Sequence, residues 1–309
     1  MNKRGPEIQM TTALQNFTRS ILRMYPFPYG IGRLVDRTAL RKMRFADGPL
    51  PVRCRDGFSM TVFLNDLIGR QLFLTGRFDD AIVRVLRRYM VDGDTFLDIG
   101  ANVGYVSCSL LHKFPAAKVV SVEPQNDVFD LLRSNVGALG GTRAIALNVA
   151  VGEHNGVARM RRVEGNSGAC RVVDSSSKEP GSESTEARLV TADEVIRMAA
   201  IERIELIKID VEGYELQVLR SLVPALLRFR PKAILFEHGG DSVYPSGEIH
   251  TLLLASGYRI YGIRKSLFRW SLISVDELWK TGTHAHDYLA LPAAPMAGQS
   301  ISPTTTKEA

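Results

Sequence analysis

From residue 95 onward, short apolar runs alternate with segments whose apolar residues recur every three or four positions. Short apolar runs between turn residues predict buried strands, and the longer spacing predicts helices. The expected strands are 95–99, 119–122, 144–147, 206–209, 233–236, 258–263 and 288–291. The expected helices are 103–114, 126–138, 192–198, 214–222 and 247–256, with a separate helical piece starting at Pro224. This alternation predicts an α/β fold with a doubly wound, mostly parallel sheet.

The region before residue 91 follows another pattern. Residues 51–64 form two β-like runs around the turn pair Asp56-Gly57, which predicts a hairpin. Helices are expected over 31–43 and 79–89. We therefore expect an N-terminal helical and β-hairpin extension over 1–90 and a main domain over 91–292.

Residues 12–24 predict an amphipathic helix, with Leu14, Phe17, Ile21 and Leu22 on one side. No large, uniformly apolar face with interfacial aromatic residues is visible in this segment. We therefore expect the helix to cover the core instead of anchoring the chain in a membrane.

Between residues 150 and 205 the alternation stops. Two β-like pieces, 157–163 and 169–173, precede a polar run, 174–186, that is rich in Ser, Glu and Gly. Such a composition predicts a surface excursion, and its position makes 166–186 a candidate substrate lid. The last residues, 293–309, are rich in Pro, Ser and Thr and are expected to be a disordered tail.

The positive charge is concentrated at the N-terminus. The chain carries +6 at pH 7, and residues 1–60, with 11 Lys/Arg and 4 Asp/Glu, carry +7. Such a region can meet nucleic acid, an acidic glycan or a membrane surface, or can simply be a solvated basic face. Peripheral membrane contact through this region stays open.

Three features favour a cytoplasmic protein. The three cysteines form no C-x-x-C pair, which is typical of reduced structural thiols. No apolar stretch reaches the roughly 18–20 residues of a spanning helix. Residues 1–10 lack the apolar core of a secretory leader.

Polar residues follow five of the predicted strands. They are Asp98, Glu123, Asn148, Asp210 and Glu237. In an open α/β sheet, ligands bind outside the carboxyl ends of the strands, so these five side chains predict a site.

The first of these strand ends is a glycine turn, Asp98-x-Gly100-x-x-x-Gly104, that leads into a helix. Glycines allow close backbone approach, and free N–H groups at a helix start face a nucleotide. Glu123, 25 residues after Asp98, is placed to accept hydrogen bonds from ribose hydroxyls. Its alternative role is a favourable charge at a helix N-terminus.

These motifs resemble the FkbM family of S-adenosylmethionine-dependent methyltransferases. The resemblance spans about 52–261, and its specific signature is Lys208-Ile-Asp-Val-Glu-Gly213. The stretches that carry it are Phe96–Tyr105, Val122–Pro124, Asn148–Gly152, Leu206–Glu215 and Ile234–His238. Around 189–193 the chain departs mildly, with Thr191-Ala-Asp193 where the family usually has Thr-Leu-Asp.

The resemblance implies a Rossmann-like class I methyltransferase fold with seven strands, the last antiparallel. It implies S-adenosyl-L-methionine as cofactor and a hydroxyl acceptor on a sugar, glycan, glycolipid or metabolite. Gly100–Gly104 is implied around the methionine part, Glu123 on the ribose, and Asn148 or its neighbours near adenine. The cofactor residues expected are Asp98, Gly100, Ala101, Asn102, Gly104, Tyr105, Glu123, Pro124, Asn148, Val149 and Asp210.

An alcohol nucleophile must lose its proton during methyl transfer, which calls for a nearby base. The candidates are Asp210, Glu212, Glu237 and His238. Lys208 and Asp210 lie two apart on one strand and point the same way, so Lys208 is expected to pair with Asp210, for catalysis or for structure alone.

A divalent metal held by Asp210, Glu237 and His238 is an alternative route to a nucleophile. No spacing here is diagnostic of a metal, so none is expected, and His284 and His286 are expected to lie in a surface loop.

Two other functions compete with O-methylation. The basic N-terminus suggests a nucleic-acid methyltransferase, but Asp210-Val-Glu-Gly213 stands where such enzymes carry an Asn/Asp-Pro-Pro-Tyr/Phe motif. A non-catalytic cofactor-binding module that acts through protein interaction is the third possibility. The oligomeric state and the acceptor stay open.

Overall fold

The structure is a computed structural model that describes residues 8–9, 12–25, 35, 40, 43–45, 47–163, 165–173, 184–266 and 269–293. The helix expected over 31–43 lies largely outside these residues. Most of the polar run 174–186 and the tail from residue 294 also lie outside them.

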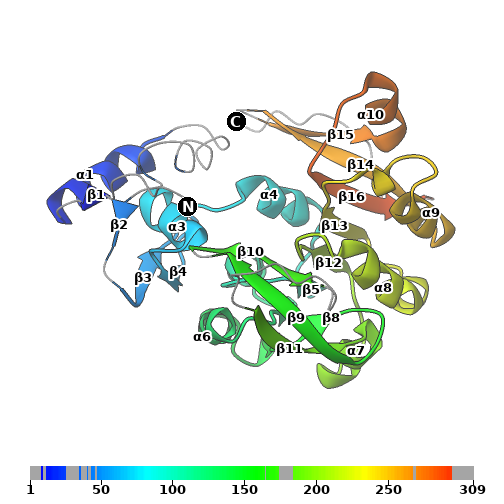
Figure 1. The fold of residues 1–309 in the computed structure, drawn as a ribbon, viewed down its shortest axis with the longest axis horizontal. Coiled ribbons are helices and arrows are strands. Elements are labelled where there is room, and N and C mark those ends of the chain that lie inside the picture. The colour runs from blue at the N-terminus through cyan, green and yellow to red at the C-terminus, as the bar shows by residue number, and fades with distance from the viewer. Residues whose placement is uncertain are drawn as a thin grey trace.

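A central sheet of eight strands organises the main domain. Its order is β15-β14-β16-β13-β12-β5-β6-β7 (Figure 1). The strands are β5 (Thr95–Ile99), β6 (Lys118–Val122), β7 (Ala144–Leu147), β12 (Leu206–Ile209), β13 (Ala233–Glu237), β14 (Tyr258–Lys265), β15 (Trp270–Ser274) and β16 (Asp287–Pro292). The five strands from β7 to β13 are parallel, and β16 runs antiparallel to both of its neighbours.

This topology confirms the doubly wound, mostly parallel sheet of a Rossmann-like fold. The sheet has one strand more than the seven expected, because β15 pairs antiparallel with β14 at the edge. All five residues of β15 are half-buried. Their sequence, Trp-Ser-Leu-Ile-Ser, lacks the continuous apolar run from which the inner strands were predicted.

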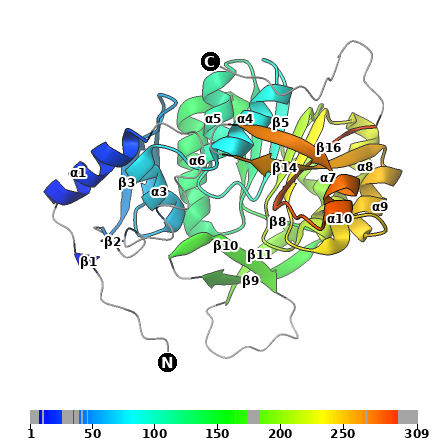
Figure 2. The same cartoon turned by 90° about the horizontal axis from the view of Figure 1, so that it is seen from above.

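Helices cover both faces of the sheet. Figure 2 shows α4 (Asp80–Tyr89), α5 (Tyr105–Lys113) and α6 (Asn126–Gly140) on one side. On the other side lie α7 (Ala192–Met198), α8 (Glu215–Phe229) and α9 (Glu248–Ala255). Successive side chains of β5 point to opposite faces of the sheet. Phe96 therefore packs in the core beneath α4, α5 and α6, and Leu97 packs in the core beneath α7, α8 and α9.

Helix α8 runs unbroken through Pro224, so the expected start of a separate helical piece there was wrong. A proline inside a helix removes one backbone hydrogen bond. Ala225 and Leu226, which follow it, are buried in the core of that side, and their burial offsets the lost bond.

A second, four-stranded sheet lies beside the main one. Its order is β10-β9-β11-β8, with β8 (Ala150–Val151), β9 (Gly156–Val163), β10 (Asn166–Val173) and β11 (Ser184–Val190). Both predicted β-like pieces fall in β9 and β10. Ser184–Glu186, expected in the polar excursion, instead pairs with β9 at the start of β11.

The N-terminal part contains the predicted hairpin, β3 (Pro49–Arg53) with β4 (Ser59–Phe63). Helix α3 (Leu67–Thr75) was not predicted, although Asp66 caps it by accepting from Ile68 N. The last helix of the described chain, α10 (Val275–Thr281), was not predicted either. A short parallel pair joins β1 (Ile8–Gln9) to β2 (Met43–Arg44).

Helix α1 (Thr12–Arg23) forms as predicted, but its expected buried face is split. Leu22 is buried, whereas Phe17 is 63% exposed and Ile21 is 52% exposed. The side that packs inward carries Arg19, whose guanidinium lies over the ring of Phe73. In the described residues no helix has the length and apolarity needed to cross a membrane.

Candidate active site

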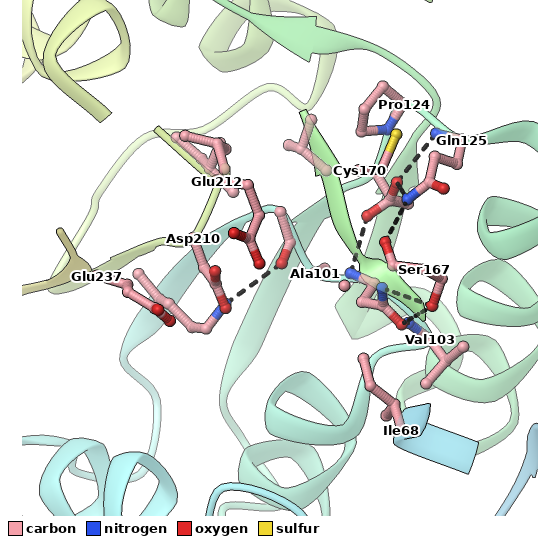
Figure 3. Close-up of a pocket in the computed structure, with 18 of the residues that line it drawn as sticks. Ile68, Ala101, Val103, Pro124, Gln125, Ser167, Cys170, Asp210, Glu212 and Glu237 are labelled. Carbon is pink, nitrogen blue, oxygen red and sulfur yellow. Dashed lines mark hydrogen bonds and ion pairs between the residues drawn. The ribbon is translucent and has the colours of Figure 1, made fainter. Parts of the chain in front are cut away.

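A pocket opens at the carboxyl ends of β5, β6, β12 and β13 (Figure 3). Most of the predicted site residues line it. They are Gly100, Ala101, Asn102, Tyr105, Glu123, Pro124, Val149, Lys208, Asp210, Glu212 and Glu237. Four predicted site residues do not line the pocket, and each contacts a residue or an element that does. They are Asp98, Gly104, Asn148 and His238.

The glycine turn after β5 is fixed by backbone contacts. Gly100 and Ala101 both donate their N–H groups to the carbonyl of Val122, at 2.9 and 3.0 Å. Gly100 has a φ of +78°, and a side chain there would collide with the carbonyl oxygen of Asp210. Only glycine therefore fits between the ends of β5 and β12.

Gly104 has a packing role. It has a φ of +88° and begins α5, and a Cβ there would lie 2.7 Å from Leu132 of α6. The residue thus lets α5 approach α6 closely instead of facing the pocket.

Glu123 is held in the turn after β6. Its carboxylate accepts from the backbone N–H of Asn102 and of Gln125, both at 3.0 Å. Burial raises the pKa of this carboxyl to about 7, because the charged form loses its hydration. The side-chain amide of Asn148 stabilises the same turn by donating to the carbonyls of Glu123 and Pro124.

An ion-paired lysine links two strand ends. Lys208 Nζ lies 3.2 Å from Asp210 and 3.4 Å from Asp98, and donates to the carbonyl of Gly100 at 3.3 Å. Asp98, wholly buried, also accepts from Ser107 Oγ at 2.7 Å. Burial alone would lower the pKa of Lys208, but Asp210 and Asp98 raise it above its ordinary value. The predicted Lys208–Asp210 pair is confirmed.

Carboxylates gather at one end of the pocket. Figure 3 shows Asp210, Glu212 and Glu237 on the same side, away from Ser167 and Gln125. Partial burial and the negative charges of neighbours, Asp210 first, raise the pKa of Glu237 to about 8. Burial and the charges of Asp210 and Glu215 raise the pKa of Glu212 to about 7. Both carboxyls therefore titrate near neutral pH.

His238 is turned away from this end. Its Nδ1 lies 3.2 Å from Glu215 and its Nε2 lies 2.7 Å from Ser242 Oγ. Glu215 in turn accepts from Gly213 N at 2.9 Å, so the histidine braces the loop that carries Glu212. With both ring nitrogens occupied, His238 is a positioning residue in this arrangement.

The described residues contain no group of three or more His, Cys, Asp and Glu side chains arranged to hold a metal ion. His284 and His286 are exposed in the loop between α10 and β16, as predicted, and His284 bonds to the hydroxyl of Tyr244 at 3.1 Å.

One wall of the pocket comes from the start of the segment 166–186, expected as a candidate substrate lid, and from α3, which was not predicted. Strand β10 contributes Ser167 and Cys170, and α3 contributes Ile68. Ser167 accepts from Asn102 and from Gln125, and its own N–H donates to Asp66 at 2.6 Å. These contacts join segments about 40 to 100 residues apart, and no motif marked them.

Asp79 is a further residue that was missed. It lines the carboxylate end of the pocket, adopts a left-handed φ of 48° and begins α4. Lys265 lies 3.4 Å from it and 2.7 Å from Asp287. A non-glycine residue with positive φ is uncommon, but backbone conformation cannot be read from a sequence.

The pocket fits a nucleotide cofactor. The close approach at Gly100 leaves its backbone open to a ligand, and Glu123 supplies a buried acceptor for hydroxyl groups. Val149, Val151 and Met160 provide an apolar wall suited to a flat purine.

Comparison with known proteins points to one family. The family described as the methyltransferase FkbM domain matches residues 98–260, which is more than half of the chain. The match begins at Asp98, at the end of β5, and includes Glu123, Lys208, Asp210 and Glu237.

Two curated relatives match part of the chain. Hexuronic acid methyltransferase AglP of Haloferax volcanii is 28% identical over 150 residues, which cover 48% of this chain and 59% of AglP. Methyltransferase sdnD of Sordaria araneosa is 27% identical over 153 residues, covering 41% of this chain and 59% of sdnD. The chain thus spans about three fifths of the length of these relatives.

Solved structures of methyltransferases align with the chain at low identity and low TM-scores. A precorrin-6y C5,15-methyltransferase from Geobacter metallireducens aligns with a TM-score of 0.40 and 12% identity, over 70% of this chain and 89% of that one. A TehB-like SAM-dependent methyltransferase from Corynebacterium glutamicum aligns with a TM-score of 0.39 and 12% identity, over 73% and 94%.

Proposed function

Because the chain belongs to the FkbM methyltransferase family, we propose that it is an S-adenosyl-L-methionine-dependent O-methyltransferase. It transfers the methyl group to a hydroxyl of an uncharged acceptor molecule. The acceptor class is a sugar, glycan, glycolipid or small metabolite. The observation that carries the proposal is a single pocket that joins the glycine turn and Glu123 to the acidic side chains of Asp210, Glu212 and Glu237.

The cofactor, when bound, supplies an electrophilic methyl group on a positively charged sulfur. The chain positions it through its own groups. The backbone at Gly100 and Ala101 approaches it, and Glu123 accepts from its ribose hydroxyls. Positioning of two reactants accounts for as much as ~7–11 kcal/mol of the barrier in well-oriented cases.

Glu237 is the proposed general base. Its raised pKa, about 8, lies close to working pH, which is the condition for efficient proton transfer. Its carboxylate takes the proton of the acceptor hydroxyl, and the ion-paired Asp210 orients that hydroxyl. Lys208 Nζ lies 3.2 Å from Asp210, so this carboxylate is already held in an ion pair and is assigned the orienting role.

The charges at this end of the pocket favour an uncharged acceptor. Four acidic side chains line it, those of Asp79, Asp210, Glu212 and Glu237, and Glu212 and Glu237 each carry part of a negative charge at neutral pH. The lysines nearby, Lys208 and Lys265, are each already paired with two carboxylates. An anionic acceptor would meet net repulsion there. AglP is by name a hexuronic acid methyltransferase, which supports a sugar acceptor. The preference for an uncharged sugar is argued from the acidic side chains of this pocket alone.

The test is methyl transfer from labelled S-adenosyl-L-methionine to a panel of glycosides, analysed by mass spectrometry. Each neutral glycoside is paired with the uronic acid of the same ring configuration. We expect a methyl group on a hydroxyl of at least one neutral member and at least about tenfold lower kcat/KM for its acidic counterpart. Preference for the acidic member, or transfer to nitrogen or carbon acceptors alone, contradicts the proposal.

A further inference from the structure

The side of α1 that faces away from the protein carries a row of large apolar side chains. Phe17 and Ile21 of α1, and Met24 directly after it, are 63%, 52% and 80% exposed, and their i, i+4, i+7 spacing puts them along one side. Only nine large apolar side chains are exposed in the described residues, and three of them belong to this row. Single exposed apolar residues are ordinary, whereas a contiguous row marks an interaction surface. We call these three residues the outer face.

The opposite side of the helix fixes this orientation. Leu22 is buried in the core, and the guanidinium of Arg19 lies 4.9 Å from the ring centroid of Phe73. Arg23 donates to the carbonyls of Arg53 and Phe73, at 2.7 and 3.4 Å. Turning the outer face inward would break these contacts, so it stays in solvent or meets a partner.

Arg53 and Arg55 lie near the C-terminal end of α1, where Arg23 donates to the carbonyl of Arg53. Arg55 donates to the carbonyls of Arg23 and Tyr25, which places its side chain at the end of α1 next to Met24. Arg53 and Arg55 are both exposed. Residues 1–60 together carry +7, so the whole region is positive.

We propose that the outer face of α1 docks on an anionic lipid surface. Phe17, Ile21 and Met24 enter the headgroup region, and Arg53 and Arg55 meet lipid phosphates. An exposed apolar helix face can enter the headgroup region in this way, and basic residues beside it strengthen binding to anionic lipids. A second copy of the chain fits less well, because it would bring another region of the same charge to the interface.

The docking surface lies one helix away from the pocket. Helix α1 packs on α3, and Leu67 and Ile68 at the start of α3 line the pocket (Figure 1). The proposal does not depend on methyl transfer, because vesicle binding is measured without turnover.

The experiment is co-sedimentation of the full chain with vesicles of phosphatidylcholine, with or without phosphatidylglycerol. We expect binding to the phosphatidylglycerol vesicles only. Phe17→Asp should weaken it by at least about tenfold, since it removes an apolar anchor and adds a negative charge. Arg53→Glu should weaken it by at least about fivefold, the effect of a single basic residue near a charged surface.

The matched control for the apolar change lies on α9, at the side of the molecule opposite α1 (Figure 1). Leu254 of α9 is 53% exposed, so Leu254→Asp makes the same change on another helix and should leave binding unaltered. Arg264→Glu is the corresponding charge control. Because all four side chains are exposed, circular dichroism should show unchanged folding.

Three results would overturn the proposal. The first is no binding to either vesicle, and the second is binding that Phe17→Asp and Leu254→Asp reduce equally. The third is self-association without vesicle binding, abolished by Phe17→Asp in light scattering, which would assign the outer face to a second copy.

Discussion

Lys208 of β12 lies directly opposite Asp98 of β5 in the parallel register, with Nζ 3.4 Å from the buried carboxylate. The same ammonium group reaches Asp210 and the carbonyl of Gly100. One buried charge thus joins the glycine turn to the strand end that carries the acidic residues. Through this pair Asp98 supports the site although it does not line the pocket.

Lys208→Met should destabilise the protein by about 3–5 kcal/mol, because it leaves the buried Asp98 without its counter-charge. The double variant Asp98→Leu with Lys208→Met should lose much less, since both charges are then gone. Urea denaturation of the two variants measures the difference. A single-variant loss below about 1 kcal/mol would contradict a structural role for the pair.

Gly100→Ala should lower stability by about 2 kcal/mol or more, because a Cβ meets the carbonyl of Asp210 at a left-handed φ. Affinity for S-adenosylhomocysteine should fall with it. Gly137→Ala is the matched control, because Gly137 lies in α6 with nothing within 4 Å of the added Cβ. That change should stabilise by about 0.5–1 kcal/mol. Equal effects of the two changes would remove the close-approach argument.

Affinity for S-adenosylhomocysteine should increase as pH rises through about 7 and level off above it. The reason is Glu123, whose pKa is raised to about 7 by burial, so that its charged form becomes available for ribose hydroxyls only above that pH. Calorimetry from pH 5.5 to 8.5 measures this, at values chosen about one to two units on either side of that pKa.

Glu123→Gln should bind S-adenosylhomocysteine more weakly and without this pH dependence, whereas Glu202→Gln, on the exposed surface, should keep both. A pH dependence that survives in Glu123→Gln would assign it to another group.

His238→Ala should lower stability by about 1–3 kcal/mol, because it leaves an oxygen of the buried Glu215 without its partner. Turnover should fall by less than about tenfold, since a positioning residue acts only through the loop it braces. Thermal unfolding and single-turnover rates, with Ser242→Ala as the companion variant, separate the two effects. A hundredfold or larger rate loss at unchanged stability would instead make His238 the base, at the scale expected for general acid–base catalysis (~10²–10⁴-fold).

The sequence predicted the framework of the site because a parallel sheet brings the ends of its strands together. Asp98, Glu123, Asp210 and Glu237 were recognised from their positions after apolar runs alone. The Lys208–Asp210 pair followed from the two-residue period of a strand. These inferences need only local pattern and one rule of sheet geometry.

The rest depended on contacts that no local pattern encodes. Ser167 reaches the pocket because β10 folds over it and Asp66 binds its N–H, a contact across 101 residues. His238 was considered a base because it follows a strand end, but its ring is turned toward Glu215. The expected buried face of α1 was right for Leu22 but wrong for Phe17 and Ile21. Arg19 packs inward on Phe73 instead, because its aliphatic stem can be covered while its charge lies over the ring.

The most direct test of the account is the single-turnover rate of methyl transfer by Glu237→Gln with a neutral hydroxyl acceptor. The control is Glu248→Gln, which changes an exposed glutamate paired with Arg220. We expect Glu237→Gln to be slower by about 10²–10⁴-fold, with affinity for S-adenosylhomocysteine kept within about twofold. A rate within about threefold of the unmodified protein, at full cofactor saturation, would contradict the assignment of Glu237 as the base.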